Sequence, residues 1–128
     1  MIPLENNSTD DLYDLMLELL RNFGDPHVLA QSRFAKTRLV QVKLTENKTL
    51  SSPEAVQEVF LDLLQIIRVG SEERADLLYM RFWQGLNVEE IVICHNPRQY
   101  CERTIMNHQR VAIEMLVLWF IERERALK

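Results

Sequence analysis

The sequence is poor in the two residue types that most often interrupt regular structure. Only 3 glycines and 4 prolines occur among 128 residues, so little of the chain is suited to tight turns. The hydrophobic fraction of 47% and the charged fraction of 27% are those of an ordinary globular domain. These totals predict long regular elements around a sizeable core.

Long apolar runs and targeting signals are also missing. The longest uninterrupted apolar run, MLVLWFI at residues 115–121, is much shorter than the roughly 20 residues that a membrane-spanning helix needs. The first residues, MIPLENNSTDD, carry acids in place of the basic start and apolar stretch of a signal peptide. We therefore expect a cytoplasmic protein.

Motifs of the common enzyme classes do not occur. The sequence has no phosphate-cradling Gly-rich loop, no H-E-x-x-H and no G-x-S-x-G. Cys94, His95, Cys101 and His108 have the chemistry of zinc ligands, but their spacing matches no common zinc finger. We expect buried free thiols and a surface imidazole instead, and thus no enzyme, no metal and no cofactor.

Charge is unevenly distributed along the chain, whose net charge is −4. Residues 1–25 and residues 51–95 each sum to −5, whereas residues 26–50 sum to +4 and residues 96–113 to +2. A weakly basic stretch within an acidic chain can still bind DNA, because the charge close to the phosphates governs the contact.

Helix start and stop signals divide the sequence into five or six helices. Capping-type residues at Ser8, Asp25, Ser51, Ser71 and Asn87 precede segments with apolar residues at helical spacing. Glycines follow two of these segments, and the last helix is expected to start near residue 102 and to run toward the end. The segment LVQVKLTENKTLSS alternates like a strand but has no partner, and so predicts an extended connector or a frayed helix.

The predicted fold is therefore all-α. We divide it into an N-terminal helical segment at residues 1–50, for packing or dimerisation, and a second domain at residues 51–128 that ends in a long apolar helix.

The second domain resembles region four of the bacterial sigma factors, within residues 72–118. The phrases that carry the resemblance are LLYMRFWQGL, VEEIV and ERTI, in that order. The matching residues are Leu78, Arg81, Phe82, Gly85, Leu86, Glu89, Glu90, Ile91, Arg103, Thr104 and Ile105. The resemblance implies a helix-turn-helix, in which an apolar knot of Phe82, Ile91, Ile105 and Ala112 holds two helices at a fixed angle.

The resemblance also implies a DNA-contacting face on the last helix. Arg103 and Arg110 would contact phosphates or guanine, and Asn107 would pair with adenine. The DNA-binding residues expected on this basis are Arg98, Arg103, Thr104, Asn107, His108 and Arg110.

Three features depart from the family pattern. The turn ICHNPRQYC is longer than usual and has no glycine, Cys101 replaces the usual serine cap, and Gln109 occupies a position that is normally apolar. A longer turn either bulges outward or tilts the recognition helix away from standard groove docking.

The apolar run near the end predicts a partner. Seven consecutive apolar residues cover every side of a helix, so we expect Leu116, Trp119 and Phe120 to form an interface in a homodimer or with a larger protein. The expected function is a sequence-specific transcriptional regulator that binds double-stranded DNA and, by resemblance, either contacts RNA polymerase or acts as a promoter-binding accessory. The alternative is a protein-interaction module that kept the helix-turn-helix shape without DNA binding.

Overall fold

The computed structural model describes residues 3–94 and 99–127, and these residues form helices and turns without any strand. The all-α prediction is thereby confirmed. The α-helices are α1 (Thr9–Arg21), α2 (Pro26–Gln31), α3 (Arg38–Glu46), α4 (Ser52–Gly70), α5 (Glu72–Leu78), α6 (Val88–Cys94) and α7 (Glu102–Ala126). Two 3₁₀ turns, η1 (Leu4–Asn6) and η2 (Arg33–Lys36), and the π-helical turn η3 (Tyr79–Trp83) complete the fold.

Side-chain caps set most of the helix starts, as predicted. Ser8 accepts a hydrogen bond from the backbone N–H of Asp11, and Asp25 accepts two at the start of α2. Ser51 and Glu54 form a reciprocal capping box at the start of α4. Each cap pairs backbone N–H groups that the first helical turn leaves without partners, which stabilises the helix by about 1 kcal/mol.

The segment LVQVKLTENKTLSS was expected to be an extended connector or a frayed helix. Its first part is helical and belongs to α3, which ends at Glu46. The cause lies 86 residues away, where the buried carboxylate of Glu124 accepts the backbone N–H groups of Arg38 and Leu39, both at 2.9 Å. Glu124 therefore caps α3 from the end of α7. The alternating pattern of the sequence gave no sign of this long-range partner.

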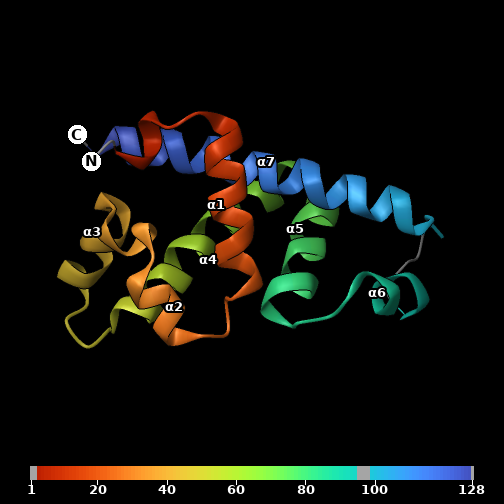
Figure 1. The fold of residues 1–128 in the computed structure, drawn as a ribbon, viewed down its shortest axis with the longest axis horizontal. Helices are drawn as coiled ribbons and strands as arrows, with labels where there is room; N and C mark the ends of the chain where they lie inside the picture. The colour runs from red at the N-terminus through yellow and green to blue at the C-terminus, as the bar shows by residue number, and fades with distance from the viewer. Residues whose placement is uncertain (1–2, 95–98, 128) are drawn as a thin grey trace.

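A single large core joins most of the helices (Figure 1). It contains buried side chains from Leu4 to Phe120, and Phe34 makes edge contacts with both Phe60 and Phe120. Because residues on both sides of position 50 share this core, the predicted division at residue 50 does not coincide with a boundary between cores. We call this cluster the main core.

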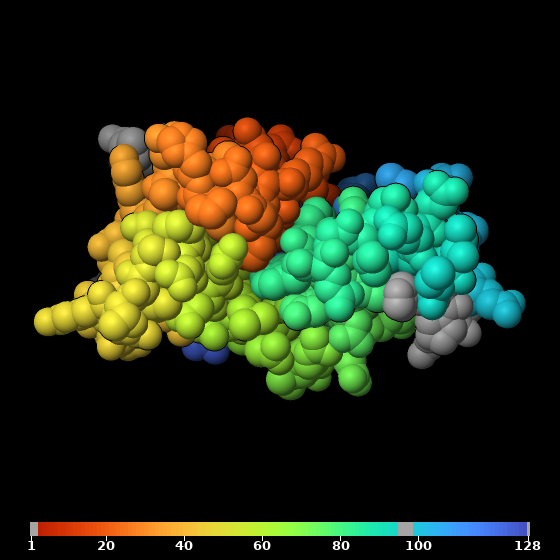
Figure 2. Space-filling view, turned by 90° about the horizontal axis from the view of Figure 1, so that it is seen from below, coloured from red at the N-terminus to blue at the C-terminus, as the bar shows by residue number. Residues whose placement is uncertain are grey.

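A second, much smaller cluster lies where α6 packs beneath the first turns of α7 (Figure 1). Its buried members are Leu77, Ile91 and Ile105, and we call it the small core. Figure 2 shows α6 and the start of α7 at one end of the elongated molecule, with α3 at the other.

The predicted knot is therefore wrong in two of its four members. Ile91 and Ile105 belong to the small core, but Phe82 and Ala112 belong to the main core. Phe82 lies in the π-helical turn η3, which changes the rotation per residue and so re-aims its side chains relative to a regular α-helix. Ala112 lies two turns beyond Ile105 on α7, where the helix has already reached the main core.

The apolar run of α7 is enclosed largely by the chain itself. Leu116 and Phe120 have no exposed surface, and Trp119 is half-buried against the main core. The prediction that Leu116 and Phe120 form an interface is therefore wrong, because both side chains are fully buried in the main core, where α7 packs against α1, α4 and α5. Leu118 is the exception, with 59% of its surface exposed. Within the described residues, no helix is long and apolar enough to cross a membrane.

Candidate nucleic-acid interface

The first half of α7 carries an exposed polar strip, as expected from the sequence. Arg103, Asn107 and Arg110 are all exposed, and their spacing of four and three residues places them on one side of the helix. We call these three residues the recognition strip. The residues Glu102 and Met106 beside them are exposed as well.

The small core fixes α7 behind the recognition strip. Ile105 is 4% exposed and contacts the cluster formed with Leu77 and Ile91. α6 itself starts at a capping box, because Asn87 and Glu90 each accept the other's backbone N–H, at 2.7 and 3.2 Å. The helix that carries the strip is thereby held against a second helix, which is the arrangement that a helix-turn-helix requires.

Hydrogen bonds of Arg81, in the middle of the π-helical turn η3, link this turn to α7; we call this contact the arginine brace. Arg81 donates from Nε to the side-chain oxygen of Gln109 at 2.7 Å, and from its guanidinium to the carbonyl of Leu86 at 2.9 Å. Burial lowers the pKa of Arg81, with a smaller contribution from Arg21. The brace gives a physical reason for the polar residue Gln109 at a position that is apolar in the sigma pattern. Sequence reasoning matched Arg81 to the family but did not find this contact.

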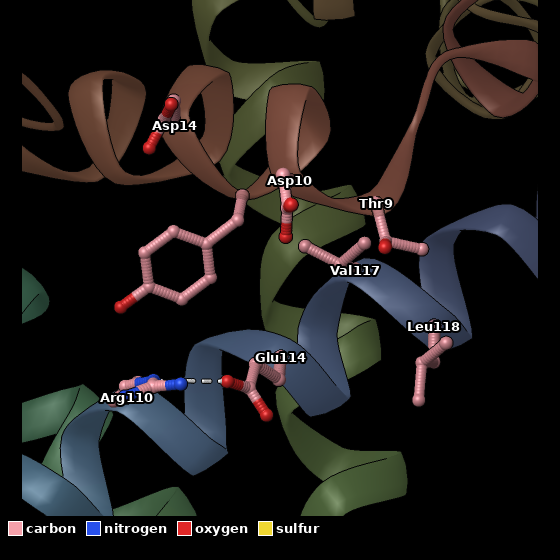
Figure 3. Close-up of a pocket in the computed structure, with 8 residues that line it drawn as sticks. Thr9, Asp10, Asp14, Arg110, Glu114, Val117 and Leu118 are labelled. Atoms are coloured by element: carbon pink, nitrogen blue, oxygen red, sulfur yellow. Dashed lines mark hydrogen bonds and ion pairs between the residues drawn. The ribbon is translucent and has the colours of Figure 1, made fainter.

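Arg110 is less available than the other two strip residues. Its guanidinium is 3.1 Å from a carboxylate oxygen of Glu114, one turn further along α7, although 71% of its side chain is exposed. It also lines a groove with Asp10 and Asp14 of α1 (Figure 3). These carboxylates oppose the approach of phosphate at this end of the strip. Sequence reasoning did not place these aspartates near Arg110, because it did not predict that α1 crosses α7.

Thr104 and His108 flank the strip and are half-buried. The Thr104 hydroxyl lies 3.2 Å from Cys101 Sγ, and the imidazole of His108 stacks on the ring of Tyr100 with centroids 5.1 Å apart. The structure thus brings both next to the strip with part of each side chain already in contact with protein. Arg98, the remaining predicted contact, lies outside the described residues, as does His95.

Both cysteines are exposed, which corrects the expectation of buried thiols. Cys101 stands at the N-cap of α7, where the hydroxyl and backbone N–H of Thr104 lower the pKa of its thiol. The part of the chain that the structure describes contains no group of three His, Cys, Asp or Glu residues placed to hold a metal ion.

The backbone enters α7 through a residue in the left-handed region. Gln99 has φ 55°, a conformation that costs a non-glycine residue roughly 1–2 kcal/mol. Glycine adopts this conformation without strain. The sigma pattern has a glycine in this turn, whereas this sequence has none.

Comparison with protein-family models, with curated proteins and with solved structures found no match to this chain. The resemblance to sigma region four accordingly remains a prediction from the sequence.

Proposed function

We propose that this chain is a DNA-binding transcriptional regulator that reads duplex DNA with the first two turns of α7. The supporting observation is the pair Arg103 and Asn107, which are exposed one turn apart on a helix that Ile105 anchors to α6. A helix of this kind fits the major groove, where Asn107 would recognise adenine while Arg103 contacts phosphate. In this proposal Arg110 contributes a phosphate contact after it leaves Glu114.

The experiment starts from a duplex selected out of a random pool and follows binding by fluorescence anisotropy. Arg103→Ala should weaken binding to all duplexes and reduce the dependence on salt, since each lost phosphate contact lowers the salt slope by about one. Asn107→Ala should instead relax the preference at one position, with a cost of roughly 1–3 kcal/mol.

Arg123→Ala is the matched control, because Arg123 is exposed on the same helix but lies beyond the recognition strip. This variant should bind like the parent protein. Equal losses for Arg103→Ala and Arg123→Ala would mean that general charge and not the strip attracts DNA, and the proposed function would then be wrong.

A protein-interaction module is the second candidate, and it is favoured by the acidic surroundings of Arg110. Asp10, Asp14 and Glu114 line the same groove as this guanidinium, and the whole chain has a net charge of −4. If no duplex binds at low salt while the protein stays folded, the interaction module becomes the better account.

Dimerisation and contact with RNA polymerase are further parts of the proposal. Paired helix-turn-helix proteins contact two half-sites one DNA turn apart. With Leu116 and Phe120 in the main core, a dimer would have to use exposed side chains such as Leu118. Sedimentation of the protein with and without the selected duplex measures the stoichiometry directly.

A further inference from the structure

A groove runs between the start of α1 and the middle of α7 (Figure 3). Its volume is about 500 Å³, within the range of roughly 300–1,000 Å³ that is usual for small-molecule sites. α1 and α7 each contribute four residues. They are Thr9, Asp10, Tyr13 and Asp14 on α1, and Arg110, Glu114, Val117 and Leu118 on α7.

The charged groups of the groove do not balance. Three carboxylates, on Asp10, Asp14 and Glu114, line the groove together with one guanidinium, on Arg110, and that guanidinium is already paired with Glu114. Figure 3 shows Asp10 pointing from α1 toward α7, on the same side as this pair. Asp10 and Asp14 make no ion pair within the described residues, so the groove has negative charge without a matching cation.

Apolar surface lies beside these carboxylates. Leu118 is 59% exposed although it stands in the most apolar part of α7, and Val117 borders the same groove. An exposed leucine next to carboxylates offers a hydrophobic contact and an ionic contact within reach of one small molecule.

The half-buried Tyr13 reports on the electrostatics of the groove. Burial raises the pKa of its hydroxyl, and the carboxylates of Glu114 and Asp14 raise it further, whereas Arg110 and Arg21 act in the opposite direction. Charged groups from both α1 and α7 therefore influence the pKa of the Tyr13 hydroxyl. A neutral phenol ring beside negative charge also suits the face-on approach of a cation.

We propose that this groove binds a small organic cation, in which an ammonium group is joined to an apolar body. The ammonium group lies between Asp10 and Glu114 and competes with Arg110 for the Glu114 carboxylate. The apolar body covers the exposed side chain of Leu118. The proposal does not require DNA binding, although the groove shares Arg110 with the recognition strip.

The test uses 4-phenylbutylammonium as the probe, with titration calorimetry and ¹H–¹⁵N spectra of the full chain. Two compounds serve as controls: 4-phenylbutan-1-ol has the apolar body without the charge, and methylammonium has the charge without the apolar body. We expect each to bind about tenfold more weakly than the probe or not at all, because each loses one of the two contacts. Resonances of Tyr13, Glu114 and Leu118 should shift with the probe.

Matched variants locate the site. Asp10→Asn and Glu114→Gln should each weaken binding of the probe several-fold, and Leu118→Ser should do the same by removing the apolar contact. Glu18→Gln is the control, because Glu18 is exposed two turns further along α1 and does not line this groove. Circular dichroism verifies that every variant keeps its helices.

Three results would overturn the proposal. The first is the absence of saturable binding at 10 mM probe, which would limit the favourable free energy of binding to less than about 3 kcal/mol. The others are equal binding of the probe and the neutral alcohol, and equal losses in Glu18→Gln and Asp10→Asn. None of these results bears on whether α7 reads DNA.

Discussion

The two halves of α7 lie in very different surroundings, although they belong to one continuous helix. The second half contributes Leu116, Val117 and Phe120 to the main core, where side chains of α1 and α4 meet them. The first half is held mainly by Ile105 in the small core and by the hydrogen bond between Arg81 and Gln109. The second half of the helix is thus buried in the main core, whereas the first half exposes one side to solvent.

The two halves of α7 are therefore expected to contribute differently, the second half to the stability of the fold and the first half to the proposed recognition of DNA. Burial of apolar area is the dominant stabilising contribution, so the main core should account for most of the free energy of folding. The small core has only to fix the direction of the first turns of α7. Surfaces held by few buried contacts open more easily than the cores to which they are attached.

The main core is most sharply tested at Phe120. Phe120→Ala should lower the free energy of unfolding by about 3–5 kcal/mol, because a fully buried ring leaves a cavity. Urea denaturation measures the loss. The control Leu118→Ala, two residues away but exposed, should change stability by less than about 1 kcal/mol. Similar losses in both variants would show that α7 is not embedded as described.

The small core is tested at Ile91. Ile91→Ala should cost about 2 kcal/mol, at the low end for such a change, because few neighbours surround this side chain. Hydrogen exchange should accelerate in α6 and in the first turns of α7 and stay slow in the second half of α7. Uniform acceleration along the whole helix would contradict the separation of the two cores.

The turn that leads into the small core is tested at Gly85. Gly85 has φ 74°, and a Cβ added there would meet no atom within 4 Å. Gly85→Ala should therefore cost about 1 kcal/mol from backbone strain alone. Gly70→Ala is the matched control, since its Cβ is equally unobstructed but its φ is not positive, and it should be neutral or slightly stabilising.

The start of α7 offers a pH test with almost no effect on folding. Thr104 lowers the pKa of Cys101, so more thiolate is present at a given pH below that pKa than in an isolated cysteine. Thr104→Val should raise the pKa of Cys101 and slow its alkylation by iodoacetamide near neutral pH, with both proteins in a Cys94→Ser background. An unchanged pH profile would mean that Thr104 does not act on the thiol.

Local signals predicted much of the fold. The caps at Ser8, Asp25 and Ser51 depend on residues three or fewer positions apart, and they appear where the sequence placed them. The exposed and buried sides of the first half of α7 also follow from helical spacing, and Arg103 and Ile105 lie on the sides expected for them.

Features that depend on distant contacts were missed. α3 is capped by Glu124, and the groove beside Arg110 exists only because α1 crosses α7. Leu116 and Phe120 were assigned to an interface because the sequence gives no measure of how much of α7 the other helices cover. Such outcomes depend on packing between elements, which spacing along one element does not encode.

The proposed division of labour within α7 is tested most directly by NMR of the ¹⁵N-labelled protein with a selected duplex. The account predicts large, saturable shifts at Arg103, Asn107 and their neighbours, with little change at the buried residues from Leu116 to Phe120. Shifts confined to other surfaces, or none at low salt, would contradict the claim that this end of α7 reads DNA.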